Sequence, residues 1–425
     1  MSDVLYRVTK IKSNEFVGAL VAFIFIFLLM ASYTIAKPVR DSLASEFTDR
    51  EVASLWTKTF FCSLVSVFIY NILAARVSIK KLVPGVFIFF ACTFILTAFA
   101  LRRGFDEVLI GKVFYVWVSV FSLFHISVFW SLMSQLYSKE QSKRVFAFIN
   151  TGASVGAIVG PILVISCIKH LPLETILFIT SAVLIGVVPL IVILNKIIEQ
   201  GPNKSEIVLS QLSDNPFSGI QEFFTHKRLI GIALFIFIFV SISTFFYLAQ
   251  KDILAAYERP ERKEILGKLD LYINSLTILL GIFATNRIAT KLGISTALAI
   301  VPAIVAVSLV LFATTPTVAM FLVLQVLRKA GNYSITRPSR EILFTGVDQE
   351  ARFKTNPFID VVVYRGGDVF WVWFFVFLGE EGVLKLDLPQ KLLVGAGIAV
   401  GWAILGFVLG KQYERAESIG EEGNG

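Results

Sequence analysis

Apolar segments long enough to cross a bilayer recur along almost the whole chain, and they constrain its fold more than any other feature. A membrane-spanning helix needs about 20 mostly apolar residues. Twelve such segments occur, at residues 17–36, 55–75, 82–101, 109–136, 145–168, 173–197, 229–249, 269–288, 294–312, 317–344, 356–378 and 388–409. The chain is 56% hydrophobic and 16% charged, whereas soluble domains hold roughly 45–50% apolar and about 25% charged residues. The sequence therefore predicts an all-α polytopic membrane protein with twelve transmembrane helices, six plus six.

Composition and residue spacing exclude several other classes of protein. The net charge of +8 comes mainly from Lys and Arg in short connections, where membrane topology explains them. No basic patch with interleaved aromatic residues suggests nucleic-acid binding. The three cysteines and three histidines are isolated in the sequence, so we expect no disulfide, no metal site and no cofactor. No nucleophile, metalloprotease or phosphate-loop motif favours an enzyme.

One connection is much longer than the others and divides the chain. It covers residues 199–228 and contains Gly201-Pro202-Asn203 and an amphipathic piece at residues 207–224. We predict an N-terminal six-helix bundle over residues 1–198, a cytoplasmic linker over 199–228 and a C-terminal six-helix bundle over 229–425. The termini and even-numbered connections hold 19 Lys and Arg residues, against 11 in the odd-numbered connections. This bias predicts that both termini face the cytoplasm.

A charged stretch interrupts the apolar pattern between residues 327 and 370. It holds Arg328, Lys329, Arg337, Arg340, Glu341, Asp360, Arg365 and Asp368. A charge at the bilayer centre costs about 2.5–3.5 kcal/mol on insertion scales, so such residues usually face a wet cavity or a partner. Helical rise places Arg328, Lys329 and Arg365 near the middle of the membrane. The stretch therefore predicts a transporter whose substrate passes these side chains.

Basic side chains outnumber acidic ones in and at the ends of the predicted spans. The basic positions are Lys37, Arg40, Lys58, Lys251, Arg328, Lys329, Arg337, Arg340 and Arg365. A positively lined cleft attracts anions, and guanidinium groups bind phosphate or carboxylate through paired hydrogen bonds. We predict that a small anionic metabolite is the substrate. The candidate binding residues are Lys37, Arg40, Lys251, Arg328, Lys329, Arg337, Arg340, Arg365, Tyr364 and Asn150.

The acidic residues in the spans have two alternative roles. They are Asp41, Asp252, Glu341, Asp360 and Asp368. Either they neutralise neighbouring cations, or one of them titrates and couples transport to protons. Asp368 is three residues from Arg365 on one helix face, which favours pairing, and Asp360 is the better proton candidate. His125 has an ordinary pKa near neutrality, although a single His on an apolar helix is more often a packing residue.

Internal similarities suggest a duplicated architecture, as in many transporters. Residues 40–44 read Arg-Asp-Ser-Leu-Ala after the first predicted helix, and residues 251–255 read Lys-Asp-Ile-Leu-Ala after the seventh. A second pattern, basic-Pro-x-Arg-acid-x-Leu, begins at Lys37 and again at Arg337. Proline breaks or kinks helices, and broken helices border substrate sites in transporters. The alternative is that each proline ends a span and that its charged neighbours lie among the lipid headgroups.

Three glycines in the fifth predicted helix are spaced four residues apart, at Gly152, Gly156 and Gly160. This spacing puts a smooth stripe on one helix face. We expect that face to pack closely against another helix.

Six helices, a central linker and six more helices resemble the major facilitator superfamily. Within that fold, residues 33–43, 144–161 and 331–368 resemble bacterial relatives of the ATP/ADP translocase family, which are nucleotide exchangers. The most specific pieces are TRPSREILF at 336–344, Asn-Pro-Phe-Ile-Asp at 356–360 and YRGGD at 364–368. The resemblance implies alternating access, with the first, fourth, seventh and tenth helices lining a central cavity, in a bacterial inner membrane. The chain is shorter than the true exchangers, and Lys37-Pro38-Val39-Arg40-Asp41 replaces their Asn-rich segment.

These observations leave two transport functions in competition. The leading hypothesis is exchange of a small organic anion, with adenine nucleotides as the first candidate. The alternative is a proton-coupled symporter or exporter of another small metabolite. A scaffold or sensor has no support, because no connection is long enough to form a sizeable soluble domain. We expect a monomer whose partners are the bilayer and the transported anion.

Overall fold

The described residues form mainly long helices. The computed structural model describes residues 11–137, 139–199, 223–225, 227–283, 285–314, 317–344, 359–379 and 382–422. All regular structure in these ranges is helical, which confirms the predicted all-α class. Nine helices within them are long and apolar enough to cross a membrane, and they match the first seven, the ninth and the twelfth predicted spans. The full count of twelve stays a prediction.

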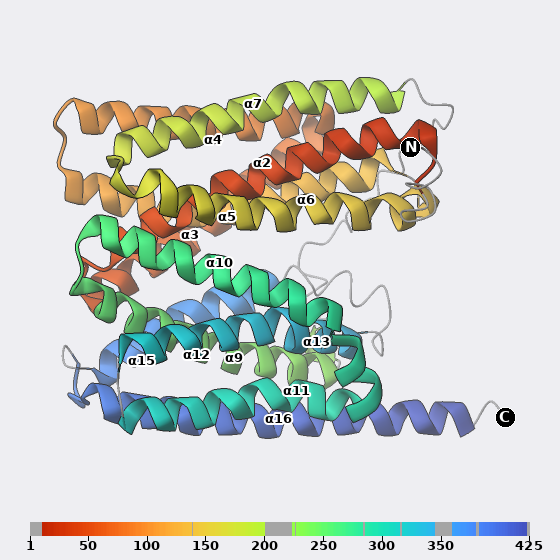
Figure 1. Cartoon of the computed structure of the whole chain (residues 1–425). Coiled ribbons are helices and arrows are strands. Elements are labelled where there is room, and N and C mark those ends of the chain that lie inside the picture. The colour runs from red at the N-terminus through yellow and green to blue at the C-terminus, as the bar shows by residue number, and fades with distance from the viewer. Residues whose placement is uncertain are drawn as a thin grey trace. The chain divides into compact units, whose positions relative to one another are not determined.

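The helices follow one another in chain order (Figure 1). In the first half they are α2 (Ser13–Ala44), α3 (Asp49–Arg76), α4 (Ile79–Arg102), α5 (Glu107–Leu136), α6 (Lys139–Ser166), the short 3-10 helix η1 (Ile168–His170) and α7 (Leu173–Glu199). In the second half they are α9 (Lys227–Ala255), α10 (Arg259–Phe283), α11 (Thr285–Thr314), α12 (Val318–Gly331), the π-helix η2 (Asn332–Thr336), α13 (Arg337–Leu343), the π-helix η4 (Ile359–Arg365), α15 (Gly366–Leu378) and α16 (Leu388–Glu422).

Packing groups the chain into two compact units, which we describe separately. The first takes in Met1–Glu46, Phe61–Ser210 and Tyr257–Leu271, and the second takes in Phe47–Phe60, Gln211–Ala256 and Tyr272–Gly425. Each unit therefore contains the start of a helix from the other half of the sequence, α10 in the first and α3 in the second. Most of the predicted linker lies outside the described residues, so the boundaries at 198 and 229 stay predictions.

In the first unit, α2 packs against α5, α6 and α7. The glycine stripe of α6 lies against α2, as predicted. A Cβ atom added at Gly152 would lie 2.6 Å from the backbone oxygen of Phe23, and Gly156 and Gly160 meet α2 as tightly. Glycine is therefore required for this close helix contact.

In the second unit, α9 packs against α12, α15 and α16, while α11 and α16 run side by side (Figure 1). The helical path of α11 is interrupted at Gly293, whose φ of 81° favours glycine. Glu414 of α16 accepts hydrogen bonds from the backbone N–H and the hydroxyl of Ser295, at 2.9 and 3.0 Å. The predicted start of the ninth span at residue 294 coincides with this interruption.

Two prolines behave differently from the expectation that they end or break a span. Pro38 lies inside α2, which continues to Ala44 instead of ending at Ala36. Pro338 is the second residue of α13, which continues directly from η2. The irregular backbone lies before it, in η2, where the helix widens without ending.

The longer helices change where several charged residues lie. α9 runs to Ala255 instead of Ala249, so α2 and α9 both end at the alanine of the repeated basic-Asp-x-Leu-Ala pattern, which agrees with the predicted duplication. The expectation that these two motifs follow their helices was wrong. The charged residues that the sequence placed after a span and the structure places inside a helix are Lys37, Arg40, Asp41, Lys251 and Asp252.

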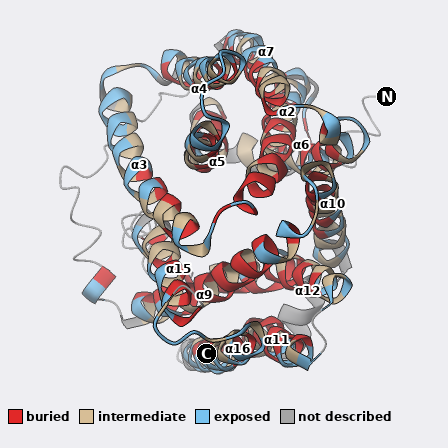
Figure 2. Cartoon of the chain, turned by 90° about the vertical axis from the view of Figure 1, so that its left-hand side faces the viewer, coloured by how far each residue is buried: buried red, intermediate tan, exposed pale blue. Residues whose placement is uncertain are grey.

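Large apolar side chains are exposed on several helices. On α3, where Figure 2 marks long exposed stretches in pale blue, they include Phe61, Val65, Phe68 and Ile69, and Phe68 is 67% exposed. A water-soluble protein rarely exposes contiguous apolar surface on this scale. Together with the nine apolar helices, this surface shows a multi-pass membrane protein.

Candidate functional site

Arg40 of α2 is paired inside the first unit. Its guanidinium donates to Asp41 at 2.9 Å and to the hydroxyl of Ser119 at 3.2 Å. It also lies over the ring of Tyr115, 5.3 Å from the centroid. A neighbouring carboxylate thus balances the charge of Arg40.

Lys37, one turn earlier on α2, pairs with an acid that sequence reasoning missed. Its ammonium lies 2.6 and 2.7 Å from the two carboxylate oxygens of Asp270 on α10. Asp270 is the second residue of the predicted eighth span, and its place among apolar residues was a signal that could have identified it.

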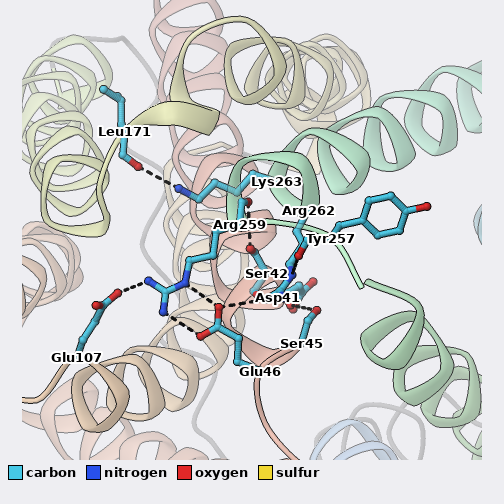
Figure 3. A network of polar contacts seen from close by, with 10 residues as sticks. All are labelled: Asp41, Ser42, Ser45, Glu46, Glu107, Leu171, Tyr257, Arg259, Arg262 and Lys263. Atoms are coloured by element: carbon cyan, nitrogen blue, oxygen red, sulfur yellow. Dashed lines mark hydrogen bonds and ion pairs between the residues drawn. The ribbon is translucent and has the colours of Figure 1, made fainter. Parts of the chain in front are cut away.

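A larger ionic network joins the end of α2 to the start of α10 (Figure 3). Glu46 accepts two hydrogen bonds from Arg259, at 2.6 and 2.8 Å, and one from Arg262 at 3.0 Å. Arg259 also contacts Glu107 of α5, and Lys263 donates to the carbonyl of Leu171 at 2.9 Å. Hydrogen bonding to Arg259 and the charges of both arginines lower the pKa of Glu46. The sequence placed these basic residues in a connection and gave no partners for them.

Lys251 near the end of α9 lies in a comparable ionic group of the second unit. Its buried ammonium lies 2.7 Å from Asp49 of α3 and 2.8 Å from Asp252, and it donates to the carbonyl of Phe47 at 3.0 Å. Asp49 was missed because it lies before the predicted start of its helix.

Arg328 of α12 has a different environment, because neutral groups surround its buried guanidinium. Its Nε and Nη2 donate to the side-chain oxygen of Gln325 at 3.0 and 2.7 Å, and its Nη1 donates to the hydroxyl of Ser243 at 3.1 Å. The group lies over the ring of Phe246, 4.8 Å from the centroid. Gln325 in turn donates to Gln250 at 3.0 Å. Within the described part of the chain, no carboxylate forms an ion pair with Arg328.

Arg340 of α13 is also buried, and its hydrogen bonding is incomplete. Its Nη1 donates to the hydroxyl of Tyr364, and its Nη2 donates to Glu341 at 2.7 Å. The side chain of Glu341 is 45% exposed. The buried Nε of Arg340 has no hydrogen-bond partner among the residues that the structure describes.

The remaining predicted residues are spread over both units. Arg365 and Asp368 lie 3.6 Å apart, as their three-residue spacing predicts. Arg337 and Asn150 are exposed, Lys329 is half-buried, and the side chain of Asp360 lies outside the described residues. His125 is buried beside Tyr33, with ring centroids 4.5 Å apart, and its Nδ1 lies 3.3 Å from the carbonyl of Phe121.

The structure thus sorts the predicted cations into two kinds. Lys37, Arg40, Lys251, Arg340 and Arg365 each have a carboxylate within ion-pair distance. Among the described residues, Arg328 has only neutral hydrogen-bond partners, and the buried Nε of Arg340 has none. Sequence reasoning missed Gln325 and Ser243, the uncharged partners of Arg328, and it missed Gln250, the partner of Gln325. Each is a polar residue in an apolar run, which was the only signal for it.

Solved transporter structures share this fold. A variant of the nucleoside transporter NupG superposes with a TM-score of 0.62 at 15% identity, covering 92% of this chain and 99% of that one. A bacterial homologue of the human lysosomal transporter Spinster, inward-facing and unoccupied, superposes with a TM-score of 0.63 at 13% identity, covering 95% and 98%. At these identities the likeness concerns the fold.

No curated protein matches the chain. The sequence profile of the Major Facilitator Superfamily matches residues 19–340. This match covers most of the sequence, and the chain therefore belongs to the Major Facilitator Superfamily of transporters.

Proposed function

We propose that this transporter is a secondary active carrier that moves a small organic anion by alternating access, with nucleotide exchange of the ATP/ADP type as the first candidate. The environment of Arg328 carries the proposal. A buried charge is costly unless it is paired and hydrogen-bonded. Arg328 is 5% exposed and has only neutral hydrogen-bond partners in the described chain.

An anionic substrate supplies the charge that this environment lacks. The amide of Gln325 and the hydroxyl of Ser243 orient the guanidinium without neutralising it. Arginine presents a planar set of donors that matches carboxylate or phosphate oxygens. A carboxylate supplied by the protein, such as Asp41 at Arg40, would compete with the substrate. Arg328 is therefore the residue on which we place the substrate anion.

The choice of nucleotides rests on the sequence resemblance of residues 331–368 to the ATP/ADP translocase relatives. The shared fold does not select a substrate, because one neighbour is named as a nucleoside transporter and the other as a homologue of a lysosomal transporter. We place the protein in a bacterial inner membrane because of its resemblance to the bacterial translocase relatives, and we place both termini in the cytoplasm because of the distribution of Lys and Arg.

The proton-coupled alternative receives less support from the side-chain contacts. Asp41, Asp252, Glu341 and Asp368 each lie within ion-pair distance of a cation. This pairing favours the neutralising role for the four acids over the proton-relay role. Transport driven by a pH gradient and lost in Asp360→Asn would favour the alternative.

Anion binding by the full-length protein in detergent tests the proposal. The panel contains ATP, ADP, other nucleotides, sugar phosphates, dicarboxylates and neutral nucleosides. A ligand at 100 times its Kd adds about 2.7 kcal/mol to the free energy of unfolding, which a thermal unfolding curve detects. We expect stabilisation by at least one anion, loss of that effect in Arg328→Gln, and no effect from neutral nucleosides. Counterflow of the active anion in liposomes then measures exchange.

The matched control is Arg103→Gln, which removes an arginine from an exposed position at the end of α4. This variant should bind and exchange the anion like the unmodified protein. Equal transport by the unmodified protein and Arg328→Gln would overturn the proposal, as would a substrate without negative charge.

A further inference from the structure

One face of α9 carries four side chains in line, Phe239, Ser243, Phe246 and Gln250. Their spacings of four, three and four residues place them on the same side of a helix. The rings of Phe239 and Tyr364 lie 6.4 Å apart between centroids. Ser243 and Phe246 contact Arg328, and Gln250 contacts Gln325. This face of α9 therefore contacts Arg328 directly, through Ser243 and Phe246. It is linked to Arg340 by Tyr364, whose ring lies beside Phe239 and whose hydroxyl accepts from Arg340.

The π-helix η2 brings these arginines toward a common face. They are twelve residues apart, and in a regular α-helix that spacing would turn them about 120° from each other. A π turn takes one extra residue. The remaining eleven residues make about three regular turns, so Arg328 and Arg340 lie on nearly the same side. The irregular helix thus aligns two cations that the sequence spacing would separate.

Both arginines keep donors available for a ligand. A guanidinium has five N–H groups, and the three hydrogen bonds of Arg328 leave two of them. Arg340 uses one N–H toward Tyr364 and one toward Glu341. Its Nε is buried without a partner in the described chain, as is the hydroxyl of Thr336, which lies four residues before it. Buried donors are normally satisfied, and an acceptor from a ligand would satisfy these.

We propose that the transported molecule carries two separate anionic groups, of phosphate or carboxylate type, one bound by Arg328 and the other by Arg340. This inference rests on the proposed function and narrows its substrate class. The helix that carries both arginines runs from α12 through η2 to α13, and their spacing of twelve residues puts their Cα atoms about 18 Å apart along it. A substrate whose charged groups are separated by a comparable distance reaches both arginines, and one with a single charged group reaches only one.

Synthetic ligands test the two-point contact without assuming a natural substrate. Alkane bisphosphonates of increasing length are compared with alkyl monophosphonates of the same lengths, by thermal unfolding of the full-length protein in detergent. We expect bisphosphonates to bind about tenfold or more tightly than the monophosphonates, as a second charge-assisted contact provides. We also expect one chain length to bind best, because the two arginines are fixed by the fold.

Variants of each arginine complete the test. In Arg328→Gln and in Arg340→Gln, bisphosphonates should bind no more tightly than monophosphonates. Arg340→Lys keeps the positive charge and provides a second test if Arg340→Gln does not fold. It should retain part of the preference for bisphosphonates over monophosphonates. Arg103→Gln should retain all of it. The unfolding temperature without ligand reports directly whether each variant is folded.

The outcomes separate this inference from the proposed function. Equal binding of mono- and bisphosphonates by the unmodified protein would overturn the two-point contact while leaving anion transport in place. A preference for bisphosphonates that persists in Arg340→Gln would also overturn it. Failure of every anion to bind, together with transport of a neutral substrate, would remove the proposed function as well.

Discussion

Lys37 of α2 and Asp270 of α10 form a bidentate ion pair, with the ammonium 2.6 and 2.7 Å from the two carboxylate oxygens. Lys251 of α9 forms a comparable pair with Asp49 of α3 at 2.7 Å. In each case, a lysine near the end of the first helix in one sequence half meets an acid on the second helix of the other half. The helix ends that carry the repeated sequence pattern thus each hold such a pair, at Lys37 one turn before the motif in α2 and at Lys251, the first residue of the motif, in α9.

The Lys37–Asp270 pair should contribute measurably to stability. Asp270→Asn leaves a largely buried ammonium without its carboxylate, and removing one partner of a buried pair costs about 3–5 kcal/mol. Because the side chain of Lys37 is 23% exposed, we expect about 2–3 kcal/mol, at or below the lower end of that range. Denaturant unfolding in detergent measures the change. The exchanged variant Lys37→Asp with Asp270→Lys should recover part of the loss, and an unchanged free energy of unfolding in Asp270→Asn would contradict the pairing.

The network around Glu46 should make stability depend on pH in the acid range. Arg259 and Arg262 hold the folded-state pKa of Glu46 below its ordinary value of 4.5. A depressed pKa contributes stability that is fully present above about 4.5 and is lost as the pH falls through the folded-state pKa. We therefore expect Glu46→Gln to lower the unfolding temperature at pH 6, and the difference from the unmodified protein to shrink on acidification below pH 4. A difference that is constant with pH would show that the charge of Glu46 plays no part.

Close packing of α6 against α2 should make the glycine stripe intolerant of larger side chains. Gly152→Ala places a methyl group 2.6 Å from the backbone oxygen of Phe23, and overpacking of this kind costs about 1–3 kcal/mol. Gly186→Ala in α7 is the matched control, because a Cβ there meets nothing within 4 Å. Alanine favours helix over glycine by up to about 1 kcal/mol, so this control should be neutral or stabilising. Unfolding of both variants in one detergent compares them directly, and equal stability would contradict the close contact.

The apolar pattern predicted most helices because a bilayer demands about 20 apolar residues in a row. It failed at the ends of α2 and α9, where charged residues stay helical because partners balance them. The partner of Lys37 is 233 residues away in sequence, so no local window contains it. Prediction likewise found the charged residues of α12 and α13 but not the π-helix between them, because its widening depends on packing as well as on local sequence.

Prediction of the candidate site was limited in the same way. The sequence marked Arg328 and Arg40 alike, as cations inside apolar segments. The fold shows that Arg40 pairs with the neighbouring Asp41, while Arg328 is held by Gln325 and by Ser243 of another helix. Asp41 follows Arg40 directly in the sequence, so a local signal for that pair existed, whereas Ser243 is 85 residues from Arg328 and could not be found locally.

Replacing Gln325 with glutamate should give Arg328 a carboxylate partner in place of a neutral one. Gln325→Glu changes one amide to a carboxylate of nearly the same shape, beside guanidinium nitrogens that already lie 2.7 and 3.0 Å from the side-chain oxygen. The new ion pair should raise the unfolding temperature of the ligand-free protein, because an ionised acceptor replaces a neutral one at Arg328 and the amide of Gln250 can turn to donate where it now accepts from Gln325. The same carboxylate should compete with the substrate anion and weaken its binding about tenfold or more. Thermal unfolding with and without the active anion measures both effects in one experiment.

Gln325→Leu serves as the comparison, because it removes the hydrogen bonds without adding charge. This variant should lower the ligand-free unfolding temperature while leaving Arg328 able to bind the anion. Unchanged anion affinity in Gln325→Glu would mean that the substrate does not meet Arg328.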